Sequence, residues 1–230
     1  MTPVWSAAAV SDSPFRPVAD ARPDDVPWPA MTWPPDPGAV LRGQTVALTP
    51  VDPERDAGEL FAALDDDAVW RHLTGRPTDA EATRDALAQG ISSGRLPWLV
   101  RLARPLAGLP EGAVVGTSSY LEVSVPDARL EIGWTSYAPE VWGSAVNPET
   151  KLLLLGYAFE VLGAGRVQLK TDVRNTRSQQ AIARLGARYE GTLRRYQRRA
   201  DDTVRDTVLF SVLAPEWPAV RDGLLARLAG

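Results

Sequence analysis

The sequence feature that most constrains the fold is a helix-forming stretch that is apolar on every side. It lies within VWGSAVNPETKLLLLGYAFE, residues 141–160. A helix that is apolar all round must be buried, and a chain of 230 residues is long enough to bury it between a sheet and a second layer. We therefore expect a core helix over about residues 148–162, with apolar residues all around its axis: Leu152, Leu153, Leu154, Leu155, Phe159 and Leu162.

The turn before this helix has two interpretations. Asn147 is a good N-cap, and Pro148 suits the first helical position because its missing N–H costs nothing there. Gly143, Ser144 and Ala145 are small, so a ligand could also approach their backbone N–H groups closely. A helix N-terminus with free N–H groups binds anions. The turn alone is therefore compatible with a helix cap and with an anion site.

The patterns on both sides of this helix alternate between strand and helix, which indicates a mixed α/β domain. They predict strands over residues 41–51, 97–103, 113–123, 128–138, 166–173, 187–199 and 204–214. They predict further helices over residues 53–64, 78–94, 178–187 and 217–228. We expect one mixed sheet with helices on its faces, and a hairpin loop at residues 104–112.

The N-terminal residues 1–39 differ from the rest in their many Pro and Trp residues, among them Trp5, Trp28 and Trp33. Pro blocks helices and sheet ladders, so this arm is expected to lack regular structure. We expect residues 28–37 to lie extended on the body or on a partner subunit; the alternative is a flexible leader. Residues 40–230 form the expected folded domain.

Rare residues exclude several kinds of chemistry. The chain has no Cys, so it has no disulfide, Cys nucleophile or Cys-ligated zinc. Its single His, His72, excludes a His-rich metal site and disfavours a Ser-His-Asp triad. We expect no metal, and acid–base groups drawn from carboxylates, Tyr, Ser or water.

Hydropathy and charge indicate the cellular location and limit the classes of partner. The chain has no run of 18 apolar residues and no signal-peptide pattern, which favours a cytoplasmic protein without a membrane span. A net charge of −4 and a pI near 5.2 argue against a general nucleic-acid binder. Of the 25 basic residues only Lys151 and Lys170 are Lys, which we interpret as a compositional preference for Arg.

A second motif, RVQLKTDVRNTRSQQAIARLG at residues 166–186, places Asn175 and Ser178 as N-x-x-S between a strand and a short helix. Together the two motifs resemble the GNAT (Gcn-related N-acetyltransferase) superfamily, particularly ribosomal-protein N-terminal acetyltransferases. That branch has W-G-x-G-x-x-x-E-A before its helix and Y-A-F-E near its end, matched here at residues 142–149 and 157–160. E-I-G-W at residues 131–134 resembles the family's fourth strand. The resemblance covers about residues 40–220.

The resemblance implies a GNAT fold with about seven strands, acetyl-CoA or another acyl-CoA as co-substrate, and an amine acceptor. It implies that the CoA pyrophosphate rests on backbone N–H groups of the turn Trp142, Gly143, Ser144, Ala145 and Val146. It implies that the pantetheine arm pairs with the fourth strand and bonds to the residue after the fifth, at Trp134, Thr135, Ser136, Tyr137, Asn175 and Ser178. Two departures are Glu140, where the family usually has Gln or Arg, and Ala145, where it has a second Gly.

Acyl transfer to an amine needs a base for the amine and an acid for the leaving thiolate. Glu131, acting through water, is the candidate base, with a salt-bridged strand residue as the alternative. Many relatives supply the acid from a Tyr whose position here is Ile182, so we name Ser178 in its place, with a helix-capping role as the alternative. Tyr120 and Tyr137 are further acid candidates, although core or edge positions suit them better.

A cluster of Arg residues near the C-terminus bears on the possible partners of the protein. Arg194, Arg195, Arg198 and Arg199 suggest RNA or an acidic acceptor, whereas the acidic residues just after them favour a charge-paired exposed hairpin. The leading function is an acyl-CoA-dependent N-acyltransferase acting on a small-molecule amine or a protein N-terminus. The alternatives are a GNAT-fold acyl-CoA-binding module with weak or no catalysis and an RNA-associated protein. A homodimer is compatible with the family.

Overall fold

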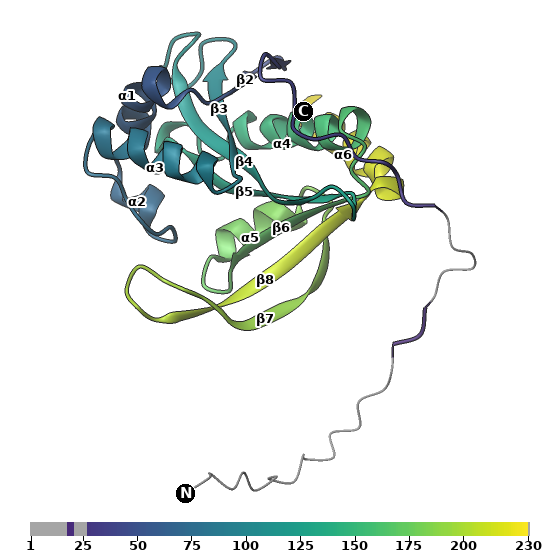
Figure 1. Cartoon of the computed structure of the whole chain (residues 1–230). Coiled ribbons are helices and arrows are strands. Elements are labelled where there is room, and N and C mark those ends of the chain that lie inside the picture. The colour runs from purple at the N-terminus through teal and green to yellow at the C-terminus, as the bar shows by residue number, and fades with distance from the viewer. Residues whose placement is uncertain (1–17, 21–26, 230) are drawn as a thin grey trace, which may run out of the picture.

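In the computed structural model, which describes residues 18–20 and 27–229, the chain forms one eight-stranded sheet with strand order β1-β2-β3-β4-β5-β6-β8-β7 (Figure 1). All neighbouring strands are antiparallel except β5 and β6, which are parallel. The strands are β1 Leu41–Arg42, β2 Val46–Pro50, β3 Leu96–Leu102, β4 Val114–Ser124, β5 Arg129–Tyr137, β6 Arg166–Asp172, β7 Arg188–Arg198 and β8 Val204–Leu213. The predicted mixed α/β sheet is confirmed, with one strand more than expected.

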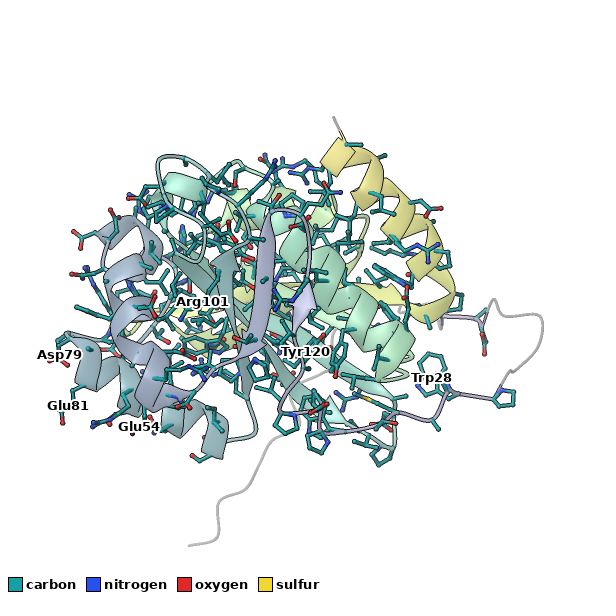
Figure 2. All side chains as sticks on the ribbon, turned by 90° about the horizontal axis from the view of Figure 1, so that it is seen from above. Trp28, Glu54, Asp79, Glu81, Arg101 and Tyr120 are labelled. Atoms are coloured by element: carbon teal, nitrogen blue, oxygen red, sulfur yellow. The ribbon has the colours of Figure 1, made fainter. Side chains whose placement is uncertain are left out.

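Helices cover both faces of the sheet. One face carries α1 Pro53–Leu64, α2 Asp67–Trp70 and α3 Ala80–Ser92, and the other carries α4 Val146–Gly156, α5 Thr176–Ala183 and α6 Trp217–Ala229 (Figure 1). The strand alternation divides the core accordingly: on β3, Leu99 packs with α1 and α3, whereas Trp98 and Val100 face the α4 side. In Figure 2, Glu54, Asp79 and Glu81 lie on the outer surface of the α1 and α3 layer.

Local signals account for several helix starts. The Asp52 carboxylate caps α1 by accepting hydrogen bonds from the N–H groups of Glu54 and Arg55, and Asp79 caps α3 at the N–H of Ala82. Two local predictions differ from the structure. The first expected strand is a hairpin, β1 and β2, and the short helix α2 was not predicted because four residues carry too little periodicity.

The core helix begins earlier than predicted. Residue Ala145 is the N-cap of α4, so the prediction of Asn147 as the cap is wrong. The Ser144 hydroxyl accepts a hydrogen bond from the N–H of Val146 at 3.2 Å, which starts the helix two residues upstream of Pro148. The helix also changes to a π-helical turn over Tyr157–Val161.

The buried carboxylate of Glu149 fixes α4 to the first hairpin. It accepts hydrogen bonds from the N–H groups of Gln44, Thr45 and Val46 at 2.7–2.9 Å. A Cβ at Gly43 would lie 2.4 Å from this carboxyl group, so Gly is required at that turn. Glu149 therefore has a structural role, because it joins the start of α4 to the turn between β1 and β2.

Residues 28–33 of the N-terminal arm lie on the body. The Trp28 indole donates a hydrogen bond to the Asp127 carbonyl at 2.6 Å, and the N–H of Thr32 donates to the Leu162 carbonyl at 2.7 Å. Met31 is buried, and the Trp33 ring packs edge-on against Tyr120 at 6.3 Å. Figure 2 shows Trp28 far from the α1 and α3 layer. Trp5 and its neighbours lie outside the described residues.

Candidate active site

Strands β5 and β6 separate partway along their length. They pair only from Arg129–Arg166 to Glu131–Gln168, whereas β6 pairs with β8 over its whole length. From Ile132 onward the β5 edge facing β6 therefore offers backbone N–H and C=O groups without a strand partner. This opening, the β5–β6 split, leads into a cleft of about 1010 Å³. The predicted pantetheine segment, residues 134–137, lies along it.

A β-bulge turns the side chains of β5 at this point. Ser119 of β4 is opposite Gly133 and Thr117 is opposite Ser136, so β5 has one extra residue between these pairs. Trp134 within the bulge has a φ of +48°. The Thr135 side chain consequently points toward α4, where its hydroxyl bonds to Lys151.

The small-residue turn is a partly open cradle of N–H groups. The N–H of Trp142 donates to Pro139, that of Ser144 to Val141, and that of Val146 to the Ser144 hydroxyl. The N–H groups of Gly143 and Ala145 donate to no other described residue. Gly143 has a φ of +77°, and a Cβ there would meet nothing within 4 Å, so the space beside it is open. An anion would find free donors at this helix end.

A cation lies beside the cradle. The Arg177 guanidinium packs over the Trp142 ring, 3.9 Å from its centroid, and has no carboxylate partner among the described residues. The Trp142 indole donates a hydrogen bond to the Tyr137 carbonyl at 2.9 Å, which fixes the ring against β5. Glu140 is exposed on the short 3-10 turn Pro139–Val141 and does not line the cleft. The departure at Glu140 therefore places no carboxylate in the wall of the cleft.

Asn175 and Ser178 both line the cleft from the start of α5. Asn175 is the helix N-cap, and its side-chain oxygen accepts a hydrogen bond from the N–H of Ser178 at 3.0 Å. The alternative capping role of Ser178 is therefore wrong. The Ser178 hydroxyl bonds to no other described residue.

Glu131 belongs to a group of interacting charged side chains on the face of the sheet that carries α1 and α3. Its carboxylate lies 2.8 Å from the Lys170 ammonium, which is also 2.7 Å from the carboxylate of Glu122. Gln168 donates to Glu122 at 2.9 Å and to Glu131 at 3.3 Å. A Cβ at Gly133 would lie 2.7 Å from the Glu131 carboxylate, so the glycine leaves room for it. The predicted base is therefore salt-bridged and also lines the cleft.

Burial and ion pairing shift the pKa values of Glu131 and Lys170 in opposite directions. Burial raises the pKa of Glu131, and the hydrogen bond and charge of Lys170 offset only part of that rise. Burial lowers the pKa of Lys170, but its hydrogen bonds to Glu122 and Glu131 raise it above the ordinary value overall. Glu122 is 44% exposed at its side chain, so it is the more accessible of the two carboxylates. Sequence reasoning missed Glu122 and Lys170.

Lys151 was also missed. It is buried on α4, and its ammonium nitrogen lies 2.7 Å from the Thr135 hydroxyl and 3.0 Å from the Ser118 hydroxyl. It has no carboxylate partner among the described residues, and burial lowers its pKa to about 7. The chain's two Lys residues both line the cleft.

The remaining candidates differ in position. Tyr120 is fully buried, and its hydroxyl donates to the Leu154 carbonyl, so it is a core residue. Tyr137 and Ile182 are buried at the cleft wall, and burial raises the pKa of Tyr137. His72 is half-buried at the cleft, and burial is the main cause that lowers its pKa.

The Arg-rich hairpin is only partly charge-paired. Arg199 forms two hydrogen bonds to Asp172, at 2.6 and 2.9 Å. Arg194, Arg195 and Arg198 are exposed, and none forms an ion pair with another described residue. The partner of Arg199 is Asp172 on β6, so the predicted pairing with the acidic residues just after the Arg cluster is not observed among the described residues.

A second cavity of about 570 Å³ adjoins the cleft on the α1 and α3 face. The residues that line both spaces are Leu73, Thr74, Leu121, Glu122, Trp134 and Ser136. Among the residues that the structure describes, no group of His, Cys, Asp and Glu is arranged to hold a metal ion, and no helix has the length and apolarity to cross a membrane.

A sheet split beside a helix N-terminus, with a second cavity meeting it, is an arrangement suited to bringing two substrates together. Residues 45–188 match the family described as "Acetyltransferase (GNAT) domain". The chain therefore belongs to the GNAT acetyltransferase family, and the family and fold predicted from the motifs are confirmed.

Solved structures and a curated relative agree with this family. A structure from T. thermophilus named as an acetyltransferase is 38% identical with a TM-score of 0.74, covering 86% of this chain and 100% of its own. A GCN5-related N-acetyltransferase from Brucella melitensis is 27% identical with a TM-score of 0.77, covering 87% of this chain and 89% of its own. "Uncharacterized N-acetyltransferase p20" of Bacillus licheniformis is 30% identical over 104 residues, which is 45% of this chain and 57% of the relative.

Proposed function

We propose that the protein transfers an acetyl group from acetyl-CoA to the primary amine of an acceptor, by direct transfer with both substrates bound. The observation that carries this proposal is the β5–β6 split, which ends at the open N–H cradle of residues 142–146. The identity of the acyl group is inferred from the family. A cytoplasmic location and a homodimer remain predictions.

The residues along the split and the cradle have groups that suit an acyl-CoA. The free edge of β5 suits the amide groups of a pantetheine arm, and the free N–H groups of Gly143 and Ala145 suit a pyrophosphate. Arg177 adds a cation beside those donors, and Asn175 presents its amide nitrogen to the same cleft. When bound, the acyl-CoA supplies an acyl group activated as a thioester.

The chain's own groups can handle the protons. An amine must lose its proton before it attacks, and a carboxylate with a raised pKa is a better base near neutral pH than an ordinary one. Glu131 has that property, and Lys170 fixes its position. We assign Glu131 as the base, acting through water, with Glu122 as the second carboxylate on the same Lys. Ser178 remains our candidate for protonating the thiolate.

Two measurements test this function. Isothermal titration should show acetyl-CoA binding, and thiol release with an amine panel should show turnover. Glu131→Gln should lower kcat about 100-fold, because general base catalysis contributes about 10²–10⁴-fold, while the Kd for CoA stays unchanged. The exposed Glu111→Gln serves as the matched control. Absence of CoA binding would remove the proposal, and binding without turnover on any amine would favour the acyl-CoA-binding module.

A further inference from the structure

The second cavity has a mainly apolar inner wall. Helices α1 and α3 and the segment around α2 supply its large apolar residues, which are Leu60, Phe61, Leu64, Trp70, Leu73 and Leu87. A cavity of about 570 Å³ lies within the ordinary size range of small-molecule sites. The cavity meets the cleft at Glu122 and Trp134, beside the chain of carboxylates that includes the proposed base.

The acidic residues of this wall already have cationic partners. Asp65 lies 2.7 Å from a guanidinium nitrogen of Arg76, and Glu122 lies 2.7 Å from the ammonium of Lys170. Each of these carboxylates shares its cation with a second carboxylate, Asp67 on Arg76 and Glu131 on Lys170.

Arg95, in contrast, is a cation of the cavity wall that forms no ion pair with any described residue. One guanidinium nitrogen donates to the Ala86 carbonyl at 3.3 Å, while its Nε is buried without a hydrogen-bond partner. Burial lowers the pKa of Arg95, as expected for a cation that lacks a counter-charge. An anionic ligand group that contacts the guanidinium would supply the missing counter-charge.

The position of Arg95 is fixed on two sides. Its guanidinium packs over the Trp134 ring, 4.8 Å from the centroid, and against Gly90 of α3, where a Cβ would lie 2.2 Å from a guanidinium nitrogen. Trp134 belongs to the boundary between cavity and cleft, so the unpaired cation lies beside the passage that joins the cavity to the cleft.

We propose that the acceptor is a free α-amino acid with a large apolar side chain, whose carboxylate pairs with Arg95 while its side chain fills the cavity between α1 and α3. An α-amino acid carries its carboxylate one carbon from the amine, which matches a cation beside the reaction point. A protein N-terminus has an amide at that position and offers Arg95 no charge. This inference rests on the proposed acyltransferase function.

The reaction balances with acyl-CoA as the only co-reactant. The amine nitrogen forms a bond to the acyl carbon, and the bond between that carbon and sulfur breaks. The ammonium form of the amino acid gives up one proton before attack and the nitrogen gives up a second afterwards. One proton neutralises the leaving thiolate, and the other leaves through the carboxylates of Glu131 and Glu122 to solvent.

The test is calorimetric and does not depend on turnover. L-phenylalanine, L-phenylalaninamide and phenethylamine are each titrated into protein saturated with CoA. L-phenylalanine should bind at least about tenfold more tightly than the other two, since a charged hydrogen bond contributes about 1.5–3 kcal/mol. Arg95→Gln should weaken only L-phenylalanine, by about tenfold, while the exposed Arg104→Gln should change none of the three.

The outcomes separate this inference from the proposed function. CoA binding without any preference for L-phenylalanine over its amide overturns the amino-acid acceptor and leaves the acyltransferase in place. An equal loss for all three ligands in Arg95→Gln assigns Arg95 to structure alone and also overturns the inference. If Arg95→Gln does not fold, the comparison of acid with amide in the unaltered protein decides. Failure of CoA itself to bind counts against the proposed function.

Discussion

The two lysines of the chain lie on opposite faces of the sheet and in opposite electrostatic settings. Lys170 lies between the carboxylates of Glu122 and Glu131, which raise its pKa. Lys151 lies between the hydroxyls of Ser118 and Thr135, and burial lowers its pKa to about 7. A Lys side chain is therefore a charged counter-ion on one face, whereas on the other face its pKa lies close to neutral pH. The partners available, rather than burial alone, decide the protonation state.

The largest effect expected from this contrast follows Lys170→Met. Removing the cation leaves Glu131 buried beside a second carboxylate, and breaking a buried pair from one side costs about 3–5 kcal/mol. The free energy of unfolding from urea titration at pH 7 should fall by about that amount. Lys170→Arg should retain most of it. A loss below about 1 kcal/mol in Lys170→Met would show that solvent already screens the pair.

Lys151→Met should have a smaller effect that depends on pH. The folded pKa of about 7 is below the unfolded value near 10.4, so the unfolded state binds more protons between these pH values. Stability of the unaltered protein should therefore rise with pH across this window, by up to about 1.4 kcal/mol per pH unit from this group. Because Lys151→Met lacks this titrating group, the stability of the unaltered protein minus that of Lys151→Met should become more positive by that slope as pH rises from about 7 to about 10.

Lys170 provides the internal control for that measurement. Because its folded pKa is raised, its contribution is fully present below the unfolded pKa and is lost only as pH rises through the folded pKa. The stability difference between Lys170→Met and the unaltered protein should therefore show no corresponding slope between about pH 7 and 9. An identical pH dependence in Lys151→Met and the unaltered protein would mean that Lys151 stays charged in the fold.

The smallest effect is expected from Thr135→Val. The substitution removes the nearer of the two hydroxyls that accept from Lys151 and keeps the β-branched shape. A single neutral hydrogen bond contributes about 0.5–1.5 kcal/mol, so thermal unfolding at pH 7 should report a loss of about 1 kcal/mol. Ser118→Ala, at the longer distance of 3.0 Å, should cost no more. A gain in stability on either change would show that the amine prefers an apolar surrounding.

Sequence reasoning succeeded where the determining interactions are local. The helices predicted over residues 53–64 and 78–94 are observed at Pro53–Leu64 and Ala80–Ser92, where Asp52 and Asp79 cap the first turns. The α4 start was misplaced because the Ser144 hydroxyl and the distant amides of the first hairpin compete with the Asn147–Pro148 signal.

The candidate site was only partly predictable for the same reason. Glu131, Asn175 and Ser178 belong to recognisable motifs, and the structure places all three at one cleft. Glu122 and Lys170 meet Glu131 only through the register of three strands, and the bulge at Trp134 alters which side chains face α4. The one available signal was the rarity of Lys in a chain rich in Arg.

The attachment of the N-terminal arm has a practical consequence for handling the protein. Trp28 and Thr32 bind next to Asp127 and Leu162, at the end where β5 and β6 still pair, whereas the cleft opens toward the other end of these strands. Immobilising the protein through a linker joined ahead of residue 27 would anchor it by the closed end of the sheet. Surface-based binding measurements with CoA should therefore be compatible with N-terminal capture.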